Sequence, residues 1–280
     1  MKPSFFTEIS SPIVCEYKSD SWIADHRTPF HFHDGYEILI FFNGNASFCI
    51  GQHEQFLTPG TVICCAPFSL HRALPHDPHN YDRILLHIRK DTLLSLSSTF
   101  TDLSTCFHSS SQPIYSFSKP DLDNIVALCK KLEGALHTQS FGCDVLQTAI
   151  LTELLVLLNQ KSVCSKMSVS NHMPPLVTEI FHYIDEHFTE DITVSHLANT
   201  LHHNADYLTR SFRKVANCSI RQYLILKRIQ HAGTLLSQGA TLTDACFASG
   251  FQTYSHFSKT FSAHFGISPK NYQQKYWQMH

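Results

Sequence analysis

Residues 250–272, GFQTYSHFSKTFSAHFGISPKNY, decide how the C-terminal part of this chain folds. Phe257, Phe261 and Phe265 recur every fourth residue, a spacing that predicts a helix with one face buried in a core. A second face is polar, rich in hydrogen-bond donors and compatible with a DNA major groove; it comprises Gln252, Ser255, His256 and Lys259. An ordinary amphipathic helix would show the same two faces, so this stretch alone does not distinguish a DNA-binding helix from an ordinary one.

This pattern occurs twice in the chain. Residues 207–212 match residues 256–261 at an offset of 49 positions, and Asn217 then matches Gly266 as a residue that tolerates a helix end. In both copies a serine follows that can cap the next helix. A short helix is predicted before each copy, at 194–201 and 243–249, so the sequence predicts two helix-turn-helix units.

Residues 219–236 form a strongly helical pattern between the two units. One rigid helix would fix the distance between the two recognition helices. On one face of B-DNA, such helices would enter major grooves about 34 Å apart, one turn of the double helix.

Residues 176–277 resemble the DNA-binding domain of the AraC/XylS family of transcription regulators. The similarity rests on Leu197-Ala198, Tyr207-Leu208, Phe212-Arg213-Lys214, Tyr223, Arg228, Ala232, Leu235-Leu236, Gly250-Phe251, Phe257, Phe261, Phe265-Gly266, Ser268-Pro269 and Tyr272. The sequence departs from the family at Ala245-Cys246, at Asn217 and at Ser262, where the family's usual lysine, an expected phosphate contact, is missing.

We assign DNA contacts by helix face. The residues predicted to face bases are Ala205, Asp206, Thr209, Arg210 and Arg213 in the first unit, and Gln252, Ser255, His256 and Lys259 in the second. The residues predicted to contact phosphates, which position the protein without reading sequence, are Lys214, Arg221, Lys227, Arg228 and Lys270. Any one of these charged side chains could equally be a solvated surface group that does not contact DNA.

The charge of the chain is unevenly distributed. Its net charge is −2, but from Pro174 onward 9 Lys and Arg face 7 Asp and Glu, so this part carries +2 and the first 173 residues carry −4. A modest basic excess predicts weak, salt-dependent non-specific DNA binding. The ten cysteines show no C-x-x-C spacing, and no apolar leader or membrane-spanning stretch is apparent, so we expect a cytoplasmic protein with reduced thiols.

Between about Phe30 and Ile88 the pattern changes to short strands with turns at close spacing, which favours a β-barrel or sandwich. Strands are predicted at 36–42, 46–50, 61–66 and 81–88. Asn43-Gly44 predicts a hairpin between the first two of them.

His31, His33 and Glu37, followed by Pro59-Gly60 and His71, resemble the two motifs of the cupin barrel. In metal-dependent cupins the positions that match His31, His33, Glu37 and His71 hold the metal, and residues two apart on a strand do share a face. Three imidazoles and a carboxylate suit a divalent transition metal. The alternative is that the scaffold retains these residues for hydrogen bonding or for an organic-ligand pocket. No cofactor is required, and His53, His76, His79 and His87 are interpreted as surface or core residues.

Residues 120–137 and 142–160 are predicted to be helices. An apolar stripe on the second comprises Val145, Leu146, Ile150, Leu151, Leu154, Leu155 and Leu158. Such a stripe would pack on the barrel, on a partner subunit, or on both.

The sequence therefore predicts a multidomain β and α protein. Residues 1–118 form a cupin-like sensing barrel, 119–160 a helical coupling or dimerisation segment, 161–173 a linker, and 174–280 an all-α domain with two helix-turn-helix units. The resemblance implies a homodimeric transcription regulator, not an enzyme, that binds double-stranded DNA and a small-molecule effector, contacts RNA polymerase and has no membrane partner. The alternatives are a metal-dependent cupin enzyme with a DNA-binding appendage, and a DNA-binding protein whose barrel serves only dimerisation.

Overall fold

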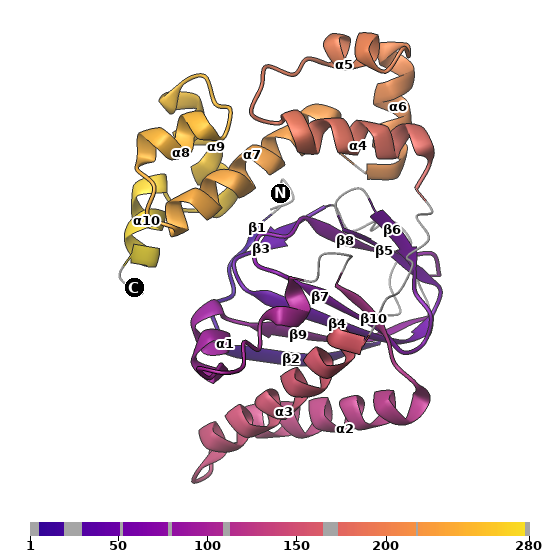
Figure 1. Ribbon diagram of the computed structural model, residues 1–280, viewed down its shortest axis with the longest axis vertical. Helices are drawn as coiled ribbons and strands as arrows, with labels where there is room; N and C mark the ends of the chain where they lie inside the picture. The colour runs from indigo at the N-terminus through magenta and orange to yellow at the C-terminus, as the bar shows by residue number, and fades with distance from the viewer. Residues whose placement is uncertain are drawn as a thin grey trace.

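The computed structural model describes residues 6–19, 30–50, 53–77, 80–108, 113–164, 173–216 and 218–277. It has a β-rich N-terminal half and an all-helical C-terminal half (Figure 1). The linker predicted at 161–173 falls largely on residues 165–172, which lie outside the described residues, as does Asn217. Within the described ranges, no helix has both the length and the apolar character needed to cross a membrane.

The larger sheet of the N-terminal half has five antiparallel strands. Their order is β10–β7–β4–β9–β2, with bounds β10 Ile114–Ser116, β7 Thr61–Cys65, β4 Tyr36–Gly44, β9 Tyr81–Ile88 and β2 Ile13–Ser19. Alternate residues of the central strand β4 face opposite layers: Leu39 and Phe41 join one buried cluster, and Ile38 and Ile40 another. Both faces of this sheet are therefore covered, which explains its near-continuous apolar sequence.

A three-stranded sheet covers one face. Its order is β6–β5–β8, with bounds β6 His53–Phe56, β5 Ala46–Ile50 and β8 His71–Pro75. Phe48 from this sheet and Phe41 from the larger one belong to the same buried cluster. A third, two-stranded sheet pairs β1 Phe6–Thr7 with β3 Phe32–His33 in parallel. The predicted barrel is thus built from facing sheets, which the hydrogen bonds of the described residues do not join into one closed sheet.

The hairpin predicted at Asn43-Gly44 is wrong. Both residues remain in register with β9, and the chain then crosses into the other sheet, where β5 pairs with β6 and β8. The Asn43 side chain donates to Asn80 Oδ1 at 2.7 Å and to Asp82 Oδ2 at 2.9 Å, which anchors this corner to β9. Gly44 has φ +117°, and a Cβ there would meet the Asn80 carbonyl, so the glycine serves a close crossing of chains.

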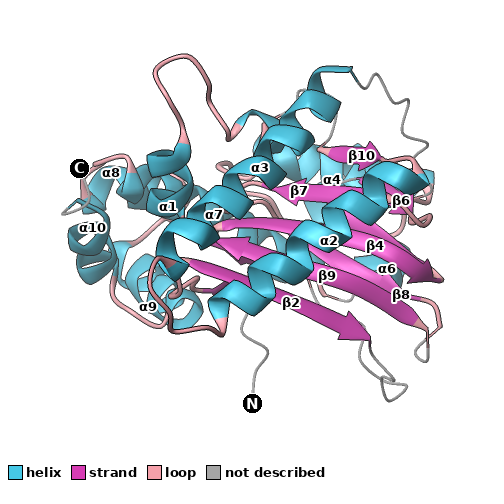
Figure 2. Cartoon of the chain, turned by 90° about the horizontal axis from the view of Figure 1, so that it is seen from below, coloured by secondary structure: helices cyan, strands magenta, loops and turns pink. Residues whose placement is uncertain are grey.

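Two helices cover the other face of the large sheet (Figure 2). They are α2 Lys119–Leu136 and α3 Cys143–Cys164, and they extend a layer that begins with α1 Lys90–Leu96 and the short 3₁₀ helix η1 Thr105–Phe107. Leu151, Leu154 and Leu155 are completely buried in this layer. Val145 and Leu146, predicted to share the buried stripe, are instead 67% and 53% exposed.

The described part of the C-terminal half contains the helices α4 Pro175–His187, α5 Val194–Thr200, α6 Ala205–Ala216, α7 Ile220–Ser237, α8 Leu242–Ala248, α9 Tyr254–Phe265 and α10 Pro269–Trp277. Helices α6 and α9 are both 12 residues long, and both ends of α9 lie 49 positions after those of α6, the offset of the sequence repeat. Leu208 and Phe212 are buried at the positions equivalent to Phe257 and Phe261. The prediction of two helix-turn-helix units joined by one helix, α7, is confirmed.

The two halves share one buried core. Phe6, Phe30, Phe32 and Phe68 of the N-terminal half pack in the same cluster as the helical domain. Phe265, the last residue of α9, lies with its ring centroid 4.2 Å from Phe6, and α7 runs over the same edge, near β1, β3 and β8 (Figure 1). The aromatic stripe predicted for α9 is therefore buried, and its last member also reaches the other half of the protein.

Two helical glycines test this packing. In Gly233→Ala, the new methyl group on α7 would lie 2.8 Å from Phe265 Cζ, in a ring stack with little freedom to move. We expect a net loss of about 1–2 kcal/mol in the free energy of unfolding, because overpacking outweighs the gain in helix propensity. Gly134→Ala on α2, where nothing lies within 4 Å, should instead stabilise by up to about 1 kcal/mol. Urea unfolding of both variants measures the difference, and equal effects would contradict this account of Gly233.

Candidate DNA-recognition surface and sensor site

Each recognition helix is held at its N-terminal end by a side-chain cap. Asn204 Oδ1 accepts from the Asp206 amide at 2.8 Å, and Thr253 Oγ1 accepts from the His256 amide at 3.3 Å. These caps occupy equivalent positions in the repeat. They set the start of each helix and hence which residues face outward.

The predicted base-facing residues lie on the outer surfaces of the two helices. Asp206, Arg210 and Arg213 are exposed on α6, where Ala205 and Thr209 are half-buried, and Ser255, His256 and Lys259 are exposed on α9. Gln252 is also exposed but precedes the cap Thr253, so its placement on the helix was wrong. The helix starts later than the spacing implied because Thr253 caps it.

Equivalent positions of the repeat carry similar chemistry. Arg210 matches Lys259, and Arg221 matches Lys270 at the exposed second residue of the helix that follows each recognition helix. Tyr207 matches His256 and is 51% exposed, although the face assignment omitted it. The repeat itself was the signal that could have identified Tyr207.

Two of the predicted phosphate contacts are engaged inside the domain. Arg228 donates to the backbone carbonyl oxygens of Phe188 at 2.7 Å and Glu190 at 2.6 Å, and its burial lowers the pKa of the guanidinium. Lys227 Nζ lies 3.0 Å from Asp185 Oδ1. These bonds tie α7 to the end of α4 and engage both side chains within the domain. Lys214, Arg221 and Lys270 are exposed.

The predicted histidines and glutamate of the N-terminal half come together around Glu37. Its Oε2 lies 3.2 Å from His33 Nε2, and its Oε1 lies 3.6 Å from His71 Nε2. His31 completes a group with Glu37 and His71, all with ligand atoms within 4.8 Å of one another. His87, interpreted from sequence as a surface or core residue, instead lies 2.9 Å from Glu37 Oε2, because β9 pairs with β4 and places the two residues opposite each other.

Hydrogen bonds to the backbone orient two of these imidazoles. His33 Nδ1 lies 2.9 Å from the Gly35 carbonyl oxygen, and His71 Nδ1 lies 2.8 Å from that of Ser69. A carbonyl accepts, so both Nδ1 atoms carry the proton and both Nε2 atoms face the carboxylate. A neutral imidazole would then oppose its lone pair to Glu37. The cluster therefore needs a positive charge, supplied either by a proton on an imidazole or by a cation.

Burial and ion pairing act in opposite directions on these groups. Burial disfavours the charged carboxylate, but His71, His33 and His87 together hold the pKa of Glu37 well below its usual value. Burial would likewise lower the pKa of His33, but the hydrogen bond that protonated His33 donates to Glu37 and the negative charge of Glu37 raise it. In the metal-free protein this arrangement favours a buried ion pair.

A metal ion would fit the same donors. His71 Nε2 has no hydrogen-bond partner within the described structure, and its Nδ1 already donates to a carbonyl, as in a typical metal-binding histidine. Two groups share the Glu37 carboxylate, one with the imidazoles of His31 and His71 and one with those of His33 and His87, and two imidazoles with a carboxylate are suitable ligands for zinc, nickel or iron. His31, His33, His71, His87 and Glu37 are the residues that would hold it.

Comparison with known proteins agrees with this two-part architecture. A model described as an AraC-like ligand binding domain matches residues 21–155, and a helix-turn-helix domain model matches residues 197–275. The chain belongs to the AraC family of transcription regulators.

Individual relatives within the AraC family are distant. The melibiose operon regulatory protein of Escherichia coli is 31% identical over 120 residues, which cover 42% of this chain and only 40% of that protein. The uncharacterized HTH-type transcriptional regulator YbfI of Bacillus subtilis is 24% identical over 231 residues, covering 82% of this chain and 81% of that one. Among solved structures, an apo form of ToxT from Vibrio cholerae aligns over 95% of this chain and 98% of its own, with 13% identity and a TM-score of 0.41.

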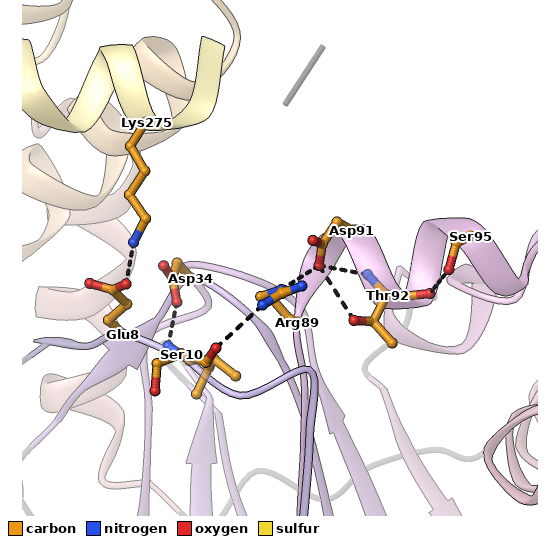
Figure 3. A network of polar contacts seen from close by, with 9 residues as sticks. Glu8, Ser10, Asp34, Arg89, Asp91, Thr92, Ser95 and Lys275 are labelled. Carbon is orange, nitrogen blue, oxygen red and sulfur yellow. Dashed lines mark hydrogen bonds and ion pairs between the residues drawn. The ribbon is translucent and has the colours of Figure 1, made fainter. Parts of the chain in front are cut away.

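A polar network of the N-terminal half lies at the seam between the two halves of this AraC-family chain, and an ion pair with the C-terminal helix crosses that seam (Figure 3). Lys275 of α10 forms an ion pair with Glu8, Asp34 Oδ1 accepts from the Ile9 amide at 2.8 Å, and Arg89 bonds to Asp91 and to the Ser10 carbonyl oxygen. A cavity of about 180 Å³ lies among these residues. Glu8 and Lys275 are each about 40% exposed, so their pair contributes little. The aromatic contacts contribute most of the attachment.

The Glu37 cluster predicts a defined pH dependence of stability. The lowered pKa of Glu37 stabilises the fold above its ordinary value of 4.5, and this is lost as pH falls through the folded pKa. The raised pKa of His33 stabilises the fold at pH values below 6.5, the ordinary pKa of histidine. This stabilisation is lost as the pH rises through the pKa of His33 in the folded protein. Glu37→Gln should therefore cost most, up to about 3 kcal/mol, between these two values.

Chemical denaturation of the wild-type protein and of Glu37→Gln, from acid to alkaline pH and with a chelator present, measures the difference in their free energies of unfolding. A cost for Glu37→Gln that stays constant from acid to alkaline pH would contradict the ion pair.

Proposed function

We propose that this protein is a sequence-specific DNA-binding transcription regulator that responds to a small molecule in its N-terminal half. One observation carries the DNA-binding part: two capped helices of equal length, at the repeat offset of 49 residues, present exposed polar faces at both ends of the single helix α7. Helices held in this way suit successive major grooves on one face of the duplex.

In this proposal the exposed residues of α6 and α9 contact base edges. Arg210 would donate two hydrogen bonds to a guanine, and Lys259 occupies the equivalent position on the second helix. Gln252 would approach an adenine from the turn before α9. Lys214, Arg221 and Lys270 would contact phosphates, which fixes register but not sequence.

The effector would act at the cluster of His31, His33, Glu37, His71 and His87. Buried donors and acceptors of fixed orientation suit a polar small molecule or a metal ion with open coordination positions. The name of the melibiose regulator connects that relative with a sugar operon. It does not identify the effector of this chain, so the chemistry of the cluster is the better guide.

A metal-dependent enzyme is the second candidate, favoured only by the ligand set around Glu37. Stoichiometric metal in the purified protein would support a metal site. The absence of metal on elemental analysis, together with an unchanged melting temperature on metal addition, would remove it. Catalytic turnover would additionally be needed, and the relatives described above are regulators.

We also propose that the protein forms a homodimer through α3. Phe141, Val145 and Leu146 leave an apolar surface exposed at the start of this helix, although the remainder of the stripe packs on the sheet. Val145→Asp should convert a dimer into a 31.9 kDa monomer in sedimentation velocity. A monomeric wild-type protein would instead leave this surface for another contact, for example with RNA polymerase. We expect all these contacts in the cytoplasm.

Arg210→Ala tests the assignment of base readout. We expect binding to weaken by about 1–3 kcal/mol and preference to relax at a single base pair, because a bidentate contact discriminates against the wrong base. Lys270→Ala should weaken binding by a similar factor on all sequences and reduce its salt dependence. Selection from a random DNA library, followed by titration of the selected site, measures both effects.

A uniform loss in Arg210→Ala would make Arg210 a phosphate contact. Failure of the wild-type protein to select any discrete site, either in the library or in a genome-wide map of bound DNA, would contradict the proposed function as a whole.

A further inference from the structure

The segment 30–33 presents different chemistry on its two faces. Side chains of consecutive residues in an extended segment point to opposite sides. His31 and His33 face the Glu37 cluster. Phe30 and Phe32 face the helical domain, where Phe30 lies 5.6 Å from Phe181 and 5.9 Å from Tyr223, and Phe32 lies 5.9 Å from Phe265 between ring centroids.

The adjacent strand β8 repeats this division over two residues. His71 faces Glu37, whereas Arg72 faces the helical domain and donates to the backbone carbonyl oxygen of Val215, in the last turn of α6. Arg72 is only 1% exposed, and its guanidinium lies 4.8 Å from the centre of the Phe30 ring. A cation at a helix C-terminus is stabilised by the helix dipole and satisfies a carbonyl that the helix leaves unpaired.

Backbone hydrogen bonds make the two segments one unit. The His31 amide donates to the His71 carbonyl oxygen at 2.9 Å, and the reverse bond is 3.0 Å. The rings of His31 and His71 lie 4.5 Å apart on the inner face, while Phe30 and Arg72 are stacked on the outer face. We call residues 30–33 with His71 and Arg72 the two-sided plate. A displacement of its inner side chains must move its outer ones.

The outer face of this plate contacts both DNA-reading units. Arg72 holds the C-terminal end of α6, and Phe32 contacts Phe265 at the C-terminal end of α9. The base-facing side chains Arg210 and Lys259 remain exposed in this arrangement. The plate therefore does not cover the DNA surface, but fixes the two recognition helices from behind.

The two units are equivalent in sequence pattern but attached differently. The buried stripe of α6 ends in Ala216, and that of α9 ends at the equivalent position in Phe265. The larger side chain reaches the sensor directly, whereas α6 is reached through its backbone, by Arg72 at the Val215 carbonyl. This difference gives the sensor a separate contact with each unit.

We propose that Arg72 is a positioning residue for DNA recognition, and that the two-sided plate couples the Glu37 cluster to the placement of both recognition helices. This inference rests on the proposed function for its biological meaning. The structural part of the proposal is that two contacts, Arg72 with α6 and Phe32 with α9, both respond to changes in the Glu37 cluster. A ligand in the cluster would alter the orientation of the two recognition helices at the ends of α7 and hence the DNA site that the protein prefers.

Arg72→Met, with Arg83→Met as a matched control, tests the first contact. Arg83 is also a buried arginine that donates to a carbonyl, that of Tyr81 at 3.1 Å, and its guanidinium stacks on the Tyr81 ring, but both contacts stay within the sensor half. We expect Arg72→Met to raise amide hydrogen exchange of residues 213–216 at least about fivefold, without changing exchange at the end of α9. Arg83→Met should leave both helix ends unchanged.

The coupling is tested by perturbing the inner cluster in the same assay. Glu37→Gln should change exchange at the ends of both α6 and α9. In the double variant with Arg72→Met, the change at α6 should be lost and the change at α9 retained, because Phe32 still contacts Phe265. His87→Gln, at the more exposed edge of the cluster, serves as a milder perturbation if Glu37→Gln does not fold.

The proposal is overturned if the inner variants alter exchange within residues 31–37 but leave both helix ends unchanged, or if Arg83→Met matches Arg72→Met. Since exchange is measured without DNA, this outcome is independent of whether the wild-type protein selects a DNA site. In DNA titrations, Arg72→Met should weaken binding to the full selected site, which both recognition helices contact, but not to DNA that carries the part contacted by one helix. Equal weakening of binding to both DNAs would also contradict a positioning role.

Discussion

Side chains of an extended chain alternate between two faces, and at residues 30–33 this constraint joins the two halves of the protein. His31 and His33 complete a buried polar cluster, while Phe30 and Phe32 complete the core of a separate helical domain. The backbone between them has no freedom to satisfy one side without the other. Phe6, which pairs in register with Phe32, extends the same outer face. The relative position of the sensor and DNA-binding halves therefore depends on this short segment together with its neighbours Phe6, Phe68 and Arg72.

The contacts across the seam differ greatly in strength. Phe30 and Phe32 are completely buried, and burying an aromatic ring contributes about 1.5–3 kcal/mol. The Glu8–Lys275 pair is partly solvated and contributes less than about 1 kcal/mol. Arg72 is a mixed case, because one hydrogen bond and a cation–π contact offset only part of the cost of burying a guanidinium. A seam of strong apolar contacts and one costly charge can be tight and still respond to small changes in the sensor.

Much of the helical half could be predicted because its signals are local. The spacing of Phe257, Phe261 and Phe265, the helix end at Gly266 and the offset of 49 residues required only neighbouring residues, and the structure places α6 and α9 at that offset. The start of α9 was predicted too early, because Gln252 and Thr253 are both plausible first-turn residues until the hydrogen bond to the His256 amide is seen.

Long-range pairing determined the remainder. The residues around Asn43-Gly44 do not indicate that β4 and β5 belong to different sheets. The residues around His87 do not indicate that β9 pairs with β4 and places His87 opposite Glu37. The roles of Arg228 and Arg72 could not be predicted from sequence either. An arginine is expected on the surface unless the fold places a carbonyl oxygen at a helix end within hydrogen-bonding distance of it. By itself the sequence determined the two equivalent helices proposed to read DNA and the histidines of the N-terminal half, because their patterns are local. Only the tertiary structure decided that those histidines and helices share one strand segment, because that depends on pairing between residues far apart in the chain.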